Sequence, residues 1–163
     1  MPRTSCGTGT TARPLSSGEK SKKTARMTYA RLYNTVARLA KSLRALGVAP
    51  GNRVAAYMPN MMETAIAMLA ATSIGAVWSS CATYIGLQAA LDRLGQIEPK
   101  VLFTVDGYFY KGKAFDSRPN AAEIAKGIPS FQKVVVVSYT PSIGLTRKRD
   151  LSQKNNYPLV DMR

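Results

Sequence analysis

Histidine is absent from all 163 residues of the chain. Its absence excludes Ser-His-Asp and Cys-His nucleophilic sites, and histidine-based zinc sites, within this sequence. Cysteine is scarce as well: Cys6 lies near the amino terminus and Cys81 lies in an apolar stretch. Two cysteines in such different surroundings form neither a disulfide framework nor a metal-ligand cluster, and we expect a reducing compartment.

Long apolar runs are also missing. The most apolar stretch, 61–78, is interrupted by Glu63 and three hydroxyl-bearing residues, whereas a membrane-spanning helix needs about 18 apolar residues. We therefore expect no membrane partner and a cytoplasmic protein. The alternative compartment is the mitochondrion, because residues 1–27 are rich in Arg, Lys, Ser and Thr and nearly free of acids, as transit peptides are.

Acidic residues are few: nine stand against 23 Lys and Arg, which gives a net charge of +14. The excess lies at the two ends, which are rich in small and hydroxyl-bearing residues, and no basic helix with interleaved aromatics is evident. We interpret the ends as solvated and flexible and expect no nucleic-acid partner. A basic protein that binds nucleic acid is kept as an alternative interpretation, and polyanionic small molecules are kept as candidate partners.

The middle of the chain alternates between helical and strand patterns. Apolar residues recur at three- and four-residue spacing between Thr28, a suitable N-cap, and Gly47, a suitable residue to end a helix. Strands are expected at 53–58, 77–80, 100–105 and 133–138; further helices at 61–74, 87–97 and 120–126; and a loop at 106–119.

Strands that are apolar throughout and alternate with helices indicate a parallel sheet covered on both faces. The fold class expected is α/β, a partial doubly wound and mostly parallel sheet of about four strands. We divide the chain into a disordered basic extension (1–27), an ordered subdomain (28–138) and a loop or disordered tail (139–163).

Three segments have compositions that suit an anionic ligand. Residues 6–14 resemble a phosphate cradle in their Gly and Thr content, but they lack the preceding strand and following helix of a working cradle, so we interpret them as a flexible tail. Residues 78–86 and 106–113 each follow an expected strand, and ligands of doubly wound folds bind at that edge of the sheet. From the residues alone, we favour a structural turn for 78–86 and a solvated, hairpin-like loop for 106–113 over ligand-binding loops.

A resemblance to a known family rests on a linked series of motifs. The chain carries Thr28-Tyr29, Leu43-Arg44-Ala45-Leu46-Gly47-Val48, Pro50-Gly51, Tyr57-Met58-Pro59-Asn60, Ser73-Ile74-Gly75-Ala76-Val77-Trp78-Ser79-Ser80-Cys81, Gln96-Ile97-Glu98-Pro99-Lys100-Val101-Leu102-Phe103 and Asp106-Gly107-Tyr108. This series resembles the opening of the AMP-forming acyl-CoA synthetases over about residues 28–138. Within that class it is more similar to the acetoacetyl-CoA synthetases than to the acetyl-CoA synthetases.

The resemblance implies an acid–thiol ligase that uses ATP, Mg²⁺ and CoA, with acetoacetate as the acid. It also implies that Gly86, Lys111 and Lys113 lie near the CoA nucleotide, because the family places a glycine loop and a basic Gly-Lys loop there. Lys side chains suit the phosphates of CoA. No catalytic and no metal-ligating residue is expected in this chain.

The chain departs from the family pattern at three places. Residues 82–86 read Ala-Thr-Tyr-Ile-Gly where the family usually has Ser-Pro-Asp-Phe-Gly, Asn52 replaces an Asp, and Arg31 stands where the family often has Glu. The family's phosphate loop, acidic ATP-site motif and adenylating lysine have no counterpart in 139–163. We therefore expect an N-terminal part of such a ligase, inactive by itself. The alternative is a non-enzymatic α/β module that binds nucleotides or CoA.

Overall fold

The computed structural model describes residues 26–139 of the chain. Its helices are α1 (Tyr29–Ala45), α2 (Met62–Ser73), α3 (Leu87–Gly95) and α4 (Arg118–Gly127). Its strands are β1 (Arg53–Tyr57), β2 (Val77–Cys81), β3 (Val101–Val105), β4 (Gly107–Tyr110), β5 (Lys113–Asp116) and β6 (Lys133–Val137). Apart from the β4–β5 hairpin, this is the alternation that the sequence predicts.

Four strands form one parallel sheet in the order β2-β1-β3-β6. The chain moves from β1 to β2 on one side, and then crosses back to place β3 on the other side of β1. The order therefore reverses between β1 and β3, which is the topological switch point of a doubly wound sheet. The expected α/β fold class is confirmed.

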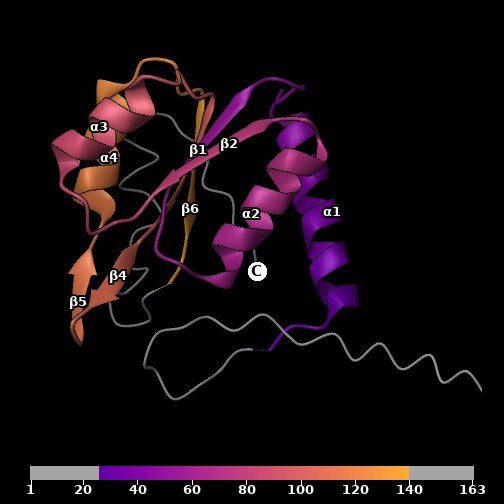
Figure 1. Cartoon of the computed structure of the whole chain (residues 1–163), viewed down its shortest axis with the longest axis horizontal. Helices are drawn as coiled ribbons and strands as arrows, with labels where there is room; N and C mark the ends of the chain where they lie inside the picture. The colour runs from indigo at the N-terminus through magenta and orange to yellow at the C-terminus, as the bar shows by residue number, and fades with distance from the viewer. Residues whose placement is uncertain (1–25, 140–163) are drawn as a thin grey trace, which may run out of the picture.

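Helices cover both faces of this sheet, with α1 and α2 on one side and α3 and α4 on the other (Figure 1). Alternate strand residues point to opposite faces. In β1, Val54 and Ala56 pack in the α1–α2 layer, whereas Ala55 and Tyr57 pack in the α3–α4 layer. Both faces are buried, and this explains why the strand sequences are apolar throughout.

Helix α1 has the boundaries that its capping residues predict. The side chain of Thr28 accepts a hydrogen bond of 3.3 Å from the backbone N–H of Arg31, as an N-cap does. At the other end Gly47 adopts a left-handed φ of 80° just after the cap residue Leu46. Local sequence therefore determines both ends of this helix.

Residues 106–119 are more regular than the expected hairpin-like loop. They form the antiparallel hairpin β4–β5, and α4 begins at Arg118 rather than at residue 120. The hairpin turns at Lys111 and Gly112, whose φ angles of 49° and 78° match a two-residue turn with both central residues left-handed. The rings of Tyr108 and Phe115 stack across the strands at 5.4 Å between centroids.

Candidate functional site

The candidate site lies at the edge of the sheet where its parallel strands end. The loop 82–86 joins β2 to α3, the hairpin β4–β5 joins β3 to α4, and Ser138 and Tyr139 follow β6. Figure 1 shows the hairpin extending from this edge beside α3 and α4. Both segments that the sequence analysis singled out at 78–86 and 106–113 thus lie at one edge of the molecule.

Gly86 is the N-cap residue of α3. No side chain caps this helix end, and its first turn is closed by the bond from the Ala90 N–H to the Gly86 carbonyl at 3.1 Å. A Cβ atom added to Gly86 would meet nothing within 4 Å. Gly86 is also exposed, so the described residues leave room for a ligand beside it, and the N–H groups at a helix start favour anions.

Lys111 and Lys113 lie at the tip of the hairpin, and both are exposed. Neither forms an ion pair with another residue in 26–139. The Lys111 ammonium lies 5.6 Å from the centroid of the Tyr110 ring, a cation–π distance that holds the charge near the turn. The tip of the hairpin is therefore cationic and available to an anionic ligand.

The acid that ends the hairpin already has a basic partner. The Asp116 carboxylate pairs with the Arg118 guanidinium at 2.6 Å. Hydrogen bonding from the Arg118 side chain lowers the pKa of Asp116, although partial burial opposes the change. Asp116 is thus charged and paired at neutral pH, and it leaves the two lysines free to bind an external anion.

Two aromatic contacts hold the hairpin against its neighbours. Tyr84, in the loop before α3, stacks on Tyr110 with ring centroids 6.1 Å apart and planes 25° apart. On the other side of the hairpin, Phe109 meets Tyr139 edge-on at 6.1 Å. The first contact brings the loop of Gly86 to the hairpin of Lys111 and Lys113. Sequence reasoning missed Tyr84, whose signal is the departure from the family pattern at that position.

Tyr57 fixes the loop that carries Gly86. Its ring is fully buried, and its hydroxyl donates a hydrogen bond of 2.8 Å to the Thr83 carbonyl. Desolvation by burial raises the pKa of Tyr57 above its usual value, so the hydroxyl keeps its proton at neutral pH. This bond ties the end of β1 to the loop 82–86.

Asp106 is buried and joins the ends of β3 and β6. Its carboxylate accepts hydrogen bonds from the Tyr139 N–H at 2.8 Å and the Ser138 hydroxyl at 3.2 Å. Asp106 and Asp116 are thus both engaged in bonds within the chain. Residues 26–139 contain no group of three side chains that could hold a metal ion, so the described edge does not fit Mg²⁺.

The cradle-like segment 6–14 lies outside the described residues.

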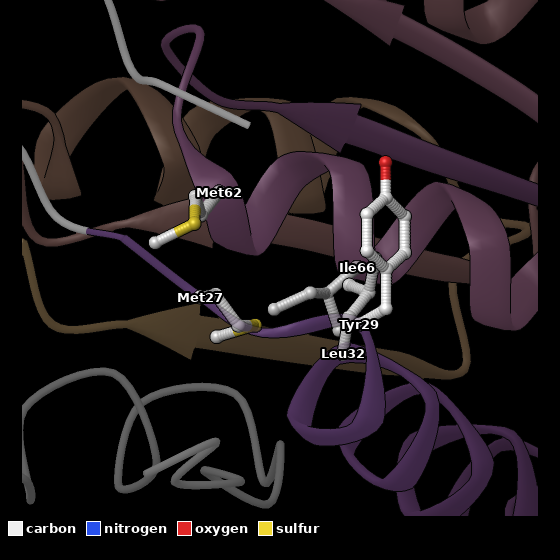
Figure 2. Close-up of a pocket in the computed structure, with 5 residues that line it drawn as sticks. All are labelled: Met27, Tyr29, Leu32, Met62 and Ile66. Carbon is white, nitrogen blue, oxygen red and sulfur yellow. The ribbon is translucent and has the colours of Figure 1, made fainter. Parts of the chain in front are cut away.

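One pocket lies between the starts of α1 and α2, on the other face of the sheet from α3 and α4. It is lined by Met27, Tyr29, Leu32, Met62 and Ile66. Figure 2 shows the Tyr29 hydroxyl directed away from the four aliphatic side chains. The pocket interior is therefore apolar and offers no donor to a charged ligand.

No helix within residues 26–139 combines the length and the apolar character that crossing a bilayer requires.

Comparison with known proteins places these features in a family. Acetoacetyl-CoA synthetase from Macaca fascicularis is 40% identical over 136 residues, which cover 83% of this chain and 20% of that protein. The Rhizobium meliloti enzyme of the same name is 46% identical over 114 residues, covering 70% of this chain and 17% of that protein. The chain thus spans about a fifth of the length of the curated relatives it matches.

A solved structure agrees with these sequence relatives. Acetoacetyl-CoA synthetase from Streptomyces lividans superimposes with a TM-score of 0.75 at 41% identity, over 86% of this chain and 20% of that chain. The description of the AMP-binding enzyme family matches residues 9–159. The expected resemblance is confirmed, and the family implies ATP, Mg²⁺ and CoA use for its full-length enzymes. The chain belongs to the AMP-binding enzyme family.

Proposed function

We propose that this chain forms the N-terminal part of an AMP-forming ligase that joins acetoacetate to CoA. Such a ligase works in two steps: the carboxylate of the acid and ATP give an acyl-adenylate and release pyrophosphate, and the CoA thiol then displaces AMP. The proposal rests on the sequence relatives and the superposition described above. No residue of this chain is assigned to either bond-breaking step.

The contribution of this chain is a surface for the nucleotide end of CoA. Lys111 and Lys113 supply cations for its phosphates, the open N-terminus of α3 at Gly86 supplies N–H donors, and Tyr84 with Tyr110 supplies a flat aromatic surface for adenine. The observation that carries this assignment is the Tyr84–Tyr110 stack, because it brings two loops from different parts of the sequence to one place.

The affinity of this surface is expected to be weak. Both lysines are exposed, and an exposed ion pair contributes only about 0–1 kcal/mol in water. Added salt should weaken the contact further, because exposed charges are screened beyond about 8–10 Å at ordinary ionic strength. A titration followed residue by residue is therefore better suited than a single bulk signal.

The test is an NMR titration of the 163-residue chain with CoA and with dephospho-CoA. We expect shifts in the loop of Gly86 and in the hairpin, smaller shifts for dephospho-CoA, and loss of both in Lys111→Ala and Lys113→Ala. Lys133→Ala is the matched control, because Lys133 begins β6 at the opposite edge of the sheet. Shifts spread over the basic ends and equal in all three variants would show only general attraction of anions, and the site would be withdrawn.

A further inference from the structure

The outer side of α1 is a row of cations without a single acid. The helix has 17 residues and carries Arg31, Arg38, Lys41 and Arg44, all of them exposed. None of the four forms an ion pair with another residue in the described part of the chain. At 100° per residue they fall within about 140° of the helix circumference. We call these four residues the basic face.

Large apolar side chains are exposed in the same helical layer. Tyr29 and Tyr33 on α1 are 55% and 73% exposed, and Met68 and Leu69 on α2 are 40% and 37% exposed. Helices α1 and α2 lie on the same side of the sheet (Figure 1). Exposed cations and exposed apolar side chains therefore both belong to the α1–α2 layer.

We propose that this surface binds an anionic lipid membrane, with α1 lying flat against the headgroups. The basic face is attracted to anionic headgroups. Tyr33 suits the headgroup level, and Met68 and Leu69 can enter the acyl boundary. A nucleic acid could use the cations and the Tyr33 ring, but it would offer no partner to two aliphatic side chains.

The contact needs no spanning helix, so it is compatible with the lack of one in residues 26–139. Helix α1 has its own apolar stripe in the core, with Leu39, Ala40 and Leu43 buried, so the bound state keeps the fold intact. A helix of 17 residues is about 25 Å long, and this length presents all four cations to a flat surface at once.

The test is co-sedimentation of the 163-residue chain with vesicles of phosphatidylcholine, with or without about one third phosphatidylserine. We expect binding only to the anionic vesicles, with partitioning that falls as salt rises. Each cation near such a surface contributes about fivefold to the partition coefficient. The variant with Arg31→Gln, Arg38→Gln, Lys41→Gln and Arg44→Gln should therefore lose about several hundredfold in partitioning.

A charge-matched variant separates this surface from net charge. It carries Arg13→Gln, Lys20→Gln, Lys22→Gln and Lys23→Gln, which remove the same charge from outside the described residues. We expect it to keep most of the binding, whereas Met68→Ser with Leu69→Ser should weaken binding at unchanged charge. Circular dichroism verifies that each variant keeps its helices.

Several results would overturn the proposal. These are no binding to anionic vesicles at low salt, an equal loss in the two four-residue variants, or no effect of the Met68 and Leu69 substitutions. A tighter, basic-face-dependent complex with a single-stranded oligonucleotide would assign the surface to nucleic acid instead.

Discussion

The Tyr57 hydroxyl joins the last residue of β1 to the loop that positions Gly86, through its 2.8 Å bond to the Thr83 carbonyl. Both groups are buried, so Tyr57→Phe leaves that carbonyl without its donor. The expected cost is about 1–2 kcal/mol in the free energy of unfolding, measured by urea titration. The same substitution should broaden the NMR signals of residues 82–86.

Tyr33→Phe is the matched control for this prediction. Tyr33 is 73% exposed, and removal of an exposed hydroxyl changes stability by less than about 0.5 kcal/mol. If the two variants unfold at the same urea concentration, the Tyr57 bond contributes nothing to stability. Positioning of the loop would then have to come from Tyr84 instead.

Cys81 ends β2 and is buried among apolar residues of the α3–α4 layer. Desolvation raises the pKa of the Cys81 thiol to about 11, although Arg93 opposes the change. Because the thiolate is the reactive form, Cys81 should react with Ellman's reagent near pH 8 about a hundredfold more slowly in the folded chain than in urea. A Cys6→Ser background leaves Cys81 as the one thiol observed.

The same thiol predicts a pH dependence of stability with a definite sign. Below the usual thiol pKa of 9.0 both states keep the proton, so the contribution to stability is complete. As pH rises from about 9 towards 11, the unfolded chain loses the proton and the folded chain keeps it, so stability falls. Cys81→Ala should flatten that part of the curve, and an unchanged slope would contradict the assignment.

At the scale of elements, α1 begins with an incomplete cap. Thr28 supplies the side-chain acceptor for the Arg31 N–H, but a capping box also needs Glu or Gln at the position of Arg31, to accept from the Thr28 N–H. A cation there also opposes the helix dipole. Arg31→Glu should therefore stabilise the fold by about 0.5–1.5 kcal/mol, measured by thermal or urea unfolding.

Arg38→Glu is the control for α1, since it changes the net charge equally in the middle of the helix. In a chain of net charge +14, any such reversal reduces general repulsion. The prediction is thus a difference: Arg31→Glu should exceed Arg38→Glu by about 0.5 kcal/mol or more. Equal effects would mean that α1 gains nothing from the completed cap.

Local signals predicted the main elements, and non-local contacts account for what was missed. Thr28 and Gly47 bound α1 by capping, which depends only on neighbouring residues. The strands β4 and β5 were not predicted within the expected hairpin-like loop, because Lys111-Gly112 is a weak turn signal and no apolar alternation surrounds it. The stack of Tyr84 on Tyr110 joins residues far apart in sequence, so no local pattern could predict it.

On the scale of the whole molecule, one edge collects the features suited to anions. Helices α2 and α3 follow the parallel strands β1 and β2, and α4 begins beside the end of β3, where the Ser117 N–H donates to the Asp106 carbonyl, so all three N-terminal ends lie at the carboxyl edge of the sheet. Such ends carry partial positive charge, and Lys111 and Lys113 add full charges at the same edge. This convergence is a consequence of topology, and it supports the proposal that the chain contributes binding rather than catalysis.

That distinction between binding and catalysis leads to the last prediction. Adenylate formation needs groups positioned on the triphosphate, because its catalysis is mostly electrostatic and positional. At the described edge Asp106 and Asp116 are both engaged, and the chain spans about a fifth of its relatives. The 163-residue chain by itself should therefore show no acetoacetate-dependent ATP–pyrophosphate exchange above a mock preparation, with the Streptomyces lividans enzyme as positive control.

Exchange that co-purifies with the chain would contradict this prediction. A second outcome is that exchange is absent while CoA causes NMR shifts that depend on Lys111. That outcome would fit both a binding part of a ligase and a non-enzymatic module that binds CoA. Co-expression with the remaining four fifths of a relative then separates these two, because only a ligase part can restore exchange.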